Sequence, residues 1–273
     1  MSWFSLIYAL KSVDIIMEKY IPGAPSGGQG GPSDPIKTAR DIVAKSHYLA
    51  ALTGAGVSAG SGIPGFRGRG GMWRKYDPVL ATMEMFRKEP GMVWEMAREL
   101  ITLTLAATPN QAHHSLAAME KSGVLKGLVT QNIDGLHQQA GSRKVIELHG
   151  SVMKLRCLEC RSDFDISGFD IMKEDPLCPA CSRVLKPGMV FFGETVPLGA
   201  LNEARLLAST ADALLVIGTS AVVNPASELP VMTKGNRGKI IEINIEATGL
   251  TNSITDVFIQ GRAEDVLPEL SIF

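Results

Sequence analysis

The sequence predicts an α/β fold in which a doubly wound, Rossmann-like parallel sheet carries a smaller second lobe. Three observations predict it: apolar strand-length segments that alternate with helical segments, a glycine-rich turn after the first strand, and two pairs of closely spaced cysteines. Ala213–Ile217 and Lys239–Asn244 are apolar without alternation. Such runs are typical of parallel strands covered on both faces.

The other elements follow from apolar spacing and from helix-breaking residues. We expect helices over 36–45, 83–107 (interrupted at 89–91), 109–120 and 263–270. We expect further strands over 47–53, 127–130, 145–148 and 257–259. Two segments interrupt the alternation, and they are expected to form the small lobe together: a helical module over 69–107 and a zinc-ribbon module over 151–188.

The remaining segments, 36–68, 108–150 and 189–273, form the predicted dinucleotide-binding domain. Residues 1–35 are expected to be a flexible tail, because 22–35 is rich in glycine and proline. The apolar stretch over 3–16 contains Lys11 and Asp14 and is too short to span a bilayer. A net charge of −1 gives no general attraction to nucleic acid or to anionic membrane. We therefore expect a cytoplasmic enzyme.

The glycine-rich turn is the first candidate site. Gly54, Gly56 and Ala59 fit the G-x-G-x-x-G/A pattern, in which small residues let the backbone approach a pyrophosphate. Glycines also serve ordinary turns, so the pattern alone is weak. Phe66 and Arg67 strengthen it, because an aromatic ring covers a flat ligand and an arginine pairs with phosphate.

The four cysteines predict a metal site. Cys157, Cys160, Cys178 and Cys181 follow a C-x2-C-x17-C-x2-C spacing, which is typical of a tetrahedral zinc site. Four thiolates leave no position for water, so the zinc is expected to be structural. A redox disulfide pair is the alternative. DNA binding by this ribbon is not favoured, since its basic residues are balanced by acids.

Polar residues follow two of the predicted strands. Gln131, Asn132 and Asp134 come after one strand and His149 after the next, which places all of them at the carboxyl edge of the sheet. His149 is therefore a candidate general base. His137 is a weaker candidate because it lies within the next helix, and His113 is interpreted as a packing or capping residue.

These motifs, in their order along the chain, resemble those of the sirtuins. They are Gly-Ala-Gly-Val-Ser-Ala-Gly-Ser-Gly-Ile-Pro from residue 54, Thr-Gln-Asn-Ile-Asp-Gly-Leu-His from 130, Leu-His-Gly from 148, the paired cysteines, Phe-Gly-Glu from 192, Gly-Thr-Ser from 218 and Ile-Asn from 243. The compact length is most similar to prokaryotic, especially archaeal, members. Sirtuins are NAD-dependent protein lysine deacylases, so the resemblance implies this activity, with NAD as co-substrate and one structural zinc ion.

The resemblance also implies residue roles. The cofactor contacts would come from Gly54, Ala55, Gly56, Ala59, Phe66, Arg67, Gln131, Asn132, Ile133, Asp134, Gly218, Thr219, Ser220, Asn244, Ile245 and Ala263. Among them, Asn132, Ile133 and Asp134 would hold the nicotinamide carboxamide. A Rossmann fold usually binds the adenosine ribose with an acid about 20 residues after the glycine turn. This sequence has no such strand-end acid, and Asn244 would take that role.

The implied chemistry transfers the acyl group of an acyl-lysine to ADP-ribose. The acyl oxygen attacks the ribose C1′ as nicotinamide leaves, and water finally releases lysine and O-acyl-ADP-ribose. His149 would be the general base, and Asn132 the second catalytic residue.

An extended acetylated peptide would bind as an added strand between two segments. Its contacts would be Val190, Phe191, Gly193, Glu194, Val222, Val223 and Asn224, whereas Phe192 is expected in the core. The protein partners implied are chromatin proteins or metabolic enzymes, with no direct nucleic acid and no membrane.

One departure from the sirtuin pattern narrows the range of acyl groups that the protein is expected to accept. Succinyl- and malonyl-selective sirtuins carry Tyr-x-x-Arg after Trp-Glu, but here Ala97 and Leu100 stand at those two places. A buried acyl carboxylate without a partner is costly, so acetyl or a longer apolar acyl group is expected. Gly65 also departs from the larger or polar residue that sirtuins often carry there.

Two other functions stay open. One is mono-ADP-ribosyl transfer from the same NAD site. The other is a non-catalytic zinc module that binds DNA or chromatin, which the presence of Asn132, Asp134 and His149 disfavours.

Overall fold

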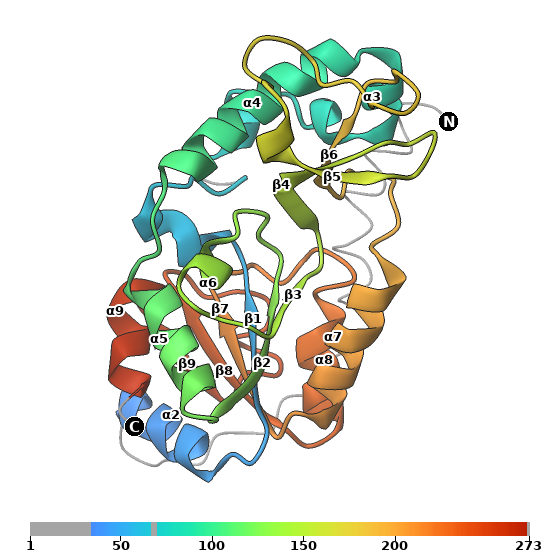
Figure 1. Cartoon of the computed structure of the whole chain (residues 1–273). Coiled ribbons are helices and arrows are strands. Elements are labelled where there is room, and N and C mark those ends of the chain that lie inside the picture. The colour runs from blue at the N-terminus through green and yellow to red at the C-terminus, as the bar shows by residue number, and fades with distance from the viewer. Residues whose placement is uncertain (1–33, 67–69, 272–273) are drawn as a thin grey trace.

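The computed structural model describes residues 34–66 and 70–271, which form a larger and a smaller lobe (Figure 1). The larger lobe is a parallel sheet between two layers of helices, and the smaller lobe joins a short antiparallel sheet to two helices. Most of the predicted N-terminal tail, residues 1–33, and Arg67 lie outside the described residues. The predicted α/β class with a second lobe is confirmed.

The large sheet has the strand order β3-β2-β1-β7-β8-β9, with every neighbouring pair parallel. Its strands are β1 (Leu49–Thr53), β2 (Leu125–Thr130), β3 (Val145–Glu147), β7 (Ala213–Ile217), β8 (Lys239–Asn244) and β9 (Val257–Gln260). The chain builds outward from β1 in one direction and from β7 in the other. The β1–β7 boundary is therefore the point where the strand order reverses, and ligands of such sheets bind beyond the strand ends there.

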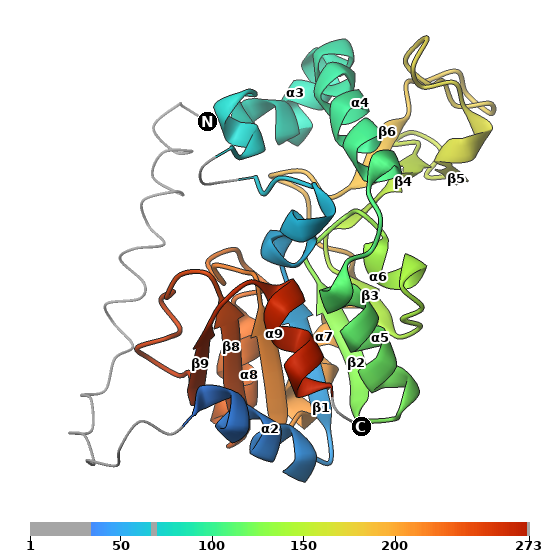
Figure 2. The same cartoon turned by 90° about the vertical axis from the view of Figure 1, so that its left-hand side faces the viewer.

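Two layers of helices cover the two faces of this sheet (Figure 2). One layer contains α2 (Pro35–Lys45), α5 (Gln111–Lys121) and α9 (Ala263–Leu270), and the other contains α7 (Leu198–Thr210) and α8 (Glu228–Gly235). Leu49 and Ala51 pack toward the first layer, whereas Ala50 and Leu52 pack toward the second. Both faces of β1 are thus buried, which explains its continuous apolar run.

The helices α7 and α8 were not predicted from the sequence. In α7, Leu198 and Leu206 are each 67% exposed, so the apolar residues do not mark a single buried face. In α8, Pro230 lies close to the start and no side chain caps the first turn. Both usual helix signals are therefore weak in this stretch.

The small lobe combines α3 (Met83–Lys88), α4 (Pro90–Ala106), β4 (Gly150–Arg156), β5 (Asp163–Asp165) and β6 (Lys186–Met189). One hydrophobic cluster joins the helices to this sheet around Trp94, which is fully buried. The Trp94 indole Nε1 donates a hydrogen bond to the Leu185 carbonyl at 2.9 Å. Arg98 pairs with Asp175 at 2.5 Å, so α4 is tied to the cysteine-bearing segment by polar contacts as well.

The predicted interruption of the long helical region is confirmed. Glu89 leaves the helical conformation between α3 and α4, with a φ of −138° and a ψ of 66°, and Pro90 begins the second helix, where its missing N–H costs nothing. The remaining short helix, α6 (Leu136–Gln139), follows the polar turn after β2. Across the part of the chain that the structure describes, no helix is both long and apolar enough to cross a bilayer.

Candidate active site and metal centre

The glycine-rich turn after β1 lies directly against the turn after β7. The Gly54 N–H donates to the Ile217 carbonyl at 3.0 Å, and the Gly56 N–H donates to the Gly218 carbonyl at 2.8 Å. A Cβ on Gly56 would lie 2.6 Å from the Gly218 Cα, and Gly218 itself has a φ of +58°. Only residues without a Cβ allow two backbones to approach so closely. The glycine pattern is therefore required first by the packing of the two turns.

Residues of this turn line two hollows. One is lined by Gly56, Ala59, Gly218, Ile243, Asn244, Ile245, Gly261, Arg262, Ala263 and Glu264. The other is lined by Ala55, Ser58, Ile63, Pro64, Phe66, Leu100, Thr104, Asn132, Ile133 and Asp134. Most of the predicted cofactor residues thus line one or the other of these two hollows.

A buried polar network supports the second hollow. Asn132 Nδ2 donates to Ser58 Oγ at 3.0 Å, and Ser58 Oγ donates to Asp134 Oδ2 at 2.7 Å. Asp134 Oδ1 also accepts the Leu136 N–H at 2.9 Å, so the carboxylate is held from two sides. Asn132 and Asp134 are 9% and 4% exposed, which fixes an amide and a carboxylate at the wall of the pocket.

Two buried histidines lie behind this network. The His113 and His137 rings are 4.9 Å apart, and burial lowers the pKa of His113 to about 4 and that of His137 to about 3. Both imidazoles are therefore neutral near pH 7. His113 accepts the Asn110 N–H, as part of the capping box at the start of α5, which confirms its interpretation as a packing and capping residue.

His149 follows β3 at the same edge of the sheet. Its Nδ1 lies 3.0 Å from the Gln131 carbonyl oxygen, which can only accept, so Nδ1 carries the proton and Nε2 keeps a free lone pair. Burial lowers the pKa of His149, and the hydrogen bond to Gln131 opposes part of that shift. A neutral imidazole with one unprotonated nitrogen is what a general base needs.

Hydrogen bonds to Thr219 connect the carboxyl ends of strands β2, β7 and β8. Gln131 Nε2 donates to Thr219 Oγ1 at 2.8 Å, and Asn244 Nδ2 donates to the Thr219 carbonyl at 3.0 Å. Thr219 is buried, whereas Ser220 and Ile245 are exposed. The predicted residues Gln131, Thr219 and Asn244 are thus brought together by direct contacts.

The two aromatic residues before Gly193 are placed in opposite ways. Phe191 is 2% exposed and packs edge-on against Phe86, with ring centroids 6.1 Å apart. Phe192 is 46% exposed, so the prediction that Phe192 lies in the core is wrong. Successive side chains of an extended segment point to opposite sides. Phe191 packs into the hydrophobic cluster of the small lobe, which includes residues of α3, so Phe192 points away from it.

The second predicted peptide segment follows the turn after β7. Val222 and Asn224 are exposed, and Val223 is partly buried. Ser227 Oγ donates to Asn224 Oδ1, and the Ser227 N–H donates to the Val223 carbonyl at 3.0 Å. The backbone between them therefore forms a compact turn that leaves Val222 facing solvent.

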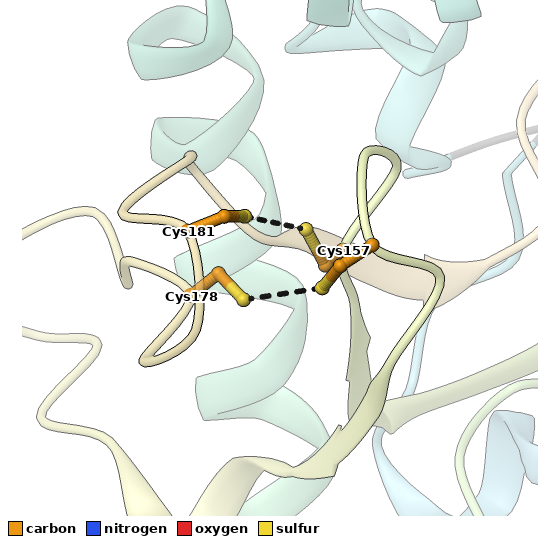
Figure 3. A group of neighbouring side chains, drawn as sticks. Cys157, Cys178 and Cys181 are labelled. Carbon is orange, nitrogen blue, oxygen red and sulfur yellow. Dashed lines mark hydrogen bonds between the residues drawn. The ribbon is translucent and has the colours of Figure 1, made fainter.

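The four cysteines meet in the small lobe, where the two C-x2-C turns face each other (Figure 3). Their sulfurs all lie within 4.8 Å of one another, with 3.4 Å between Cys157 and Cys181 and 3.5 Å between Cys160 and Cys178. A tetrahedral zinc ion with Zn–S bonds of about 2.3 Å holds its sulfurs about 3.8 Å apart. The donor set and its spacing fit one zinc ion.

Several residues of the site were missed by the sequence reasoning. Ser58 links Asn132 to Asp134, and Leu100 and Thr104 come from α4 to line the second hollow. Trp73 lies between Phe66 and Phe192, with ring centroids 5.1 and 6.4 Å away. A polar residue inside the glycine turn could have indicated Ser58. Leu100, Thr104 and Trp73 come from the small lobe. Nothing in the sequence around them indicates that they lie beside the large sheet.

Comparison with known proteins gives a consistent family assignment. The model described as "Sir2 family" matches residues 54–225. The NAD-dependent protein deacylase of Thermococcus kodakarensis is 48% identical over 239 residues, covering 85% of this chain and 93% of that protein. NAD-dependent protein deacylase 1 of Archaeoglobus fulgidus is 46% identical over 229 residues, covering 84% and 93%.

Comparison with solved structures gives the same family assignment. A Sir2 homolog–NAD complex superposes with a TM-score of 0.83 at 44% identity, covering 90% of this chain and 95% of that one. A Sir2–p53 peptide–NAD+ complex superposes with a TM-score of 0.80 at 36% identity, covering 86% and 96%.

The cysteine geometry predicts about one zinc ion per chain. Replacing Cys178, a buried sulfur, by alanine is expected to reduce bound zinc to near zero and to lower the unfolding temperature, because metal binding stabilises the small lobe. Metal analysis after gel filtration and thermal unfolding measure both effects. Ser162→Ala, beside the same knuckle, is the control that retains the metal. Full zinc content in Cys178→Ala would contradict the four-cysteine site.

The contact between Gly56 and Gly218 predicts that Gly56→Ala weakens NAD binding by about tenfold or more, because the new methyl group pushes the two turns apart. Isothermal titration with NAD measures the affinity. Gly199→Ala is the matched control, since a Cβ there meets nothing within 4 Å. Equal NAD affinity in Gly56→Ala and Gly199→Ala would show that the close approach is not needed for binding.

Proposed function

The chain belongs to the Sir2 family, and on that basis we propose that it is an NAD-dependent protein lysine deacylase. The observation that carries the proposal is the position of His149 at the edge of the sheet, with Nδ1–H bound to Gln131 and Nε2 free, beside the network of Asn132 and Asp134. A general base and a fixed amide and carboxylate thus stand at one strand edge.

NAD is the co-substrate of this activity, and we propose that the two hollows beside the glycine turn receive its two halves. We propose that Asn132, Ile133 and Asp134 bind the nicotinamide carboxamide and that Phe66 covers it. Gly56, Gly218 and Asn244 would face the pyrophosphate and the adenosine ribose. When bound, NAD supplies a ribose carbon that accepts the acyl oxygen as nicotinamide leaves. The assignments of the remaining predicted residues, Arg67 included, stay proposals of the same kind.

His149 would then remove a proton from a ribose hydroxyl through Nε2. Asn132, the second proposed catalytic residue, would orient the ligand through its buried amide. The zinc ion would take no part in the chemistry, because four cysteines leave it no open position. The zinc ion would hold the segment that follows β4 in place. Strand β4 itself begins one residue after His149.

We propose that the acylated peptide binds between Val190–Glu194 and Val222–Asn224. Phe192 and Val222 are exposed there, which supports apolar contact with an extended chain. Chromatin proteins and metabolic enzymes are the protein substrates proposed. A cytoplasmic location is proposed because the cysteines are free thiols arranged for a metal, which suits a reducing compartment.

We also propose the division of the chain into an NAD-binding domain (36–68, 108–150 and 189–273) and a small domain (69–107 and 151–188). Its support is the hydrophobic cluster around Trp94, which draws on both inserted modules.

The acyl group proposed is acetyl or a longer apolar group. Leu100 lines the hollow at the nicotinamide end, and Ala97 is fully buried. Arg98, the only basic residue between them, is committed to the Ile171 carbonyl and to Asp175. None of these side chains offers a positive charge to an acyl carboxylate.

The function is tested by incubating the protein with an acetyl-lysine peptide and NAD and separating the products. We expect loss of acetyl matched one to one by nicotinamide and O-acetyl-ADP-ribose. His149→Ala is expected to lower kcat by about 10²-fold or more, with His114→Ala, an exposed histidine, as control. Nicotinamide released while the peptide stays acetylated would indicate ADP-ribosyl transfer instead.

The proposed role of His149 as general base predicts how kcat/KM in this assay depends on pH. Burial lowers the pKa of His149, so its neutral, active form persists below pH 6.5 and is lost only as the pH falls through that lowered pKa. The acid limb of kcat/KM should therefore lie below pH 6.5. An acid limb above pH 6.5 would contradict the assignment of His149 as the base.

Acyl selectivity is tested with matched acetyl- and succinyl-lysine peptides. We expect kcat/KM for acetyl to exceed that for succinyl by about tenfold or more, because the carboxylate would be buried without a partner. Leu100→Arg should raise the succinyl activity, whereas Leu105→Arg, at a 60% exposed position of the same helix, should not. Preference of the unaltered protein for succinyl would refute the proposed acyl group.

A further inference from the structure

A lysine that the proposed chemistry does not use is buried in the small lobe. Lys186 begins β6, and its side chain is only 3% exposed. Lysine is rarely buried to this extent unless it is paired. Nothing in the local sequence marks it, since a lysine before Pro187 reads as an ordinary surface residue.

The ammonium group of Lys186 has a partner for each of its donors. Nζ donates to the Pro187 carbonyl at 2.9 Å and to the Met189 carbonyl at 2.6 Å, and it forms an ion pair with Glu194 Oε2 at 2.9 Å. It also lies 4.2 Å from the centroid of the Phe191 ring. An ammonium has three N–H donors, so this group is fully satisfied inside the protein. Burial lowers the pKa of Lys186, and the charge of Glu194 opposes that shift.

Glu194 closes a turn around this charge. The same Oε2 atom accepts the Phe191 N–H at 2.7 Å, and the Glu194 N–H donates to the Phe191 carbonyl at 3.0 Å. Gly193, with a φ of +87°, lets the chain reverse between them. The carboxylate is thus bound to Lys186 and to the backbone, and it holds the turn that exposes Phe192.

The segment before this turn is bound on two sides. The Val190 N–H donates to the His149 carbonyl at 2.8 Å. On the other side, the Phe192 N–H donates to the Ala81 carbonyl at 2.8 Å, and the Met83 N–H donates to the Phe192 carbonyl at 3.2 Å. Residues 190–192 therefore connect the backbone of His149 with the helical module, and the Lys186–Glu194 pair sits at the end of that connection.

We infer that Lys186 and Glu194 are positioning residues, which together hold residues 190–194 in the conformation that receives the peptide substrate. This inference rests on the proposed function. Glu194 acts here through the backbone that it binds, because its Oε2 is held by Lys186 and by the Phe191 N–H. The pair also fixes the backbone of His149 through Val190.

Kinetics with separate substrates test this role. Lys186→Met removes the ammonium and leaves Glu194 without its partner. We expect the KM for an acetyl-lysine peptide to rise about tenfold or more, while the KM for NAD stays within about twofold. Lys186→Arg, which keeps the charge, is expected to recover most of the peptide KM. Lys154→Met is the matched control, because Lys154 lies exposed on the neighbouring strand β4.

A double variant separates positioning from stability. Removing both charges of a buried pair often restores stability that the loss of one partner costs. Lys186→Met combined with Glu194→Gln is therefore expected to regain much of the unfolding temperature without regaining the peptide KM. If the double variant bound peptide as the unaltered protein does, the pair would be structural only, and the inference would be overturned.

Amide hydrogen exchange gives a readout that needs no turnover. In Lys186→Met, the Val190 and Phe192 amides are expected to exchange faster, while amides in β8 keep their protection. Absence of NAD-dependent deacylation by the unaltered protein would refute the proposed function, and the exchange result would still decide whether the pair holds the segment. Unchanged exchange at Val190 and Phe192 would overturn the inference.

Discussion

The turn after β1 and the turn after β7 touch backbone to backbone, and the arrangement of the site depends on this contact. Gly54, Gly56 and Gly218 permit it, and the bonds from Gly54 to Ile217 and from Gly56 to Gly218 maintain it. The reversal of strand order lies between the same two strands. Residues of the first turn line both hollows, Gly56 and Ala59 in one and Ala55 and Ser58 in the other.

The small lobe completes the site from the other side. Leu100 and Thr104 of α4 line the same hollow as Asn132 and Asp134 from the sheet. The position of α4 depends on the buried Trp94, on the Arg98–Asp175 pair and on the segment that carries the cysteines. A structural metal held by the four cysteines would influence the site indirectly, because it would order the segment against which α4 packs.

Much of the site could be predicted because its signals are local. The glycine spacing, the paired cysteines and the polar residues after β2 and β3 each lie within a few residues of one another, and a parallel sheet brings strand ends to one edge. The strands themselves were predicted from continuous apolar runs, and β7 and β8 have the expected bounds. The helices α7 and α8 were not, since exposed leucines and Pro230 obscure their pattern.

By itself, the sequence determined the fold class, the positions of Asn132, Asp134 and His149 after strand ends, and the clustering of the four cysteines as a possible metal site. Only the tertiary structure decided which of Phe191 and Phe192 is buried, that Trp73 lies between Phe66 and Phe192, and that Lys186 reaches Glu194 inside the small lobe. The physical reason is that spacing along the chain specifies local geometry. Burial and pairing depend instead on which surfaces meet when distant segments pack.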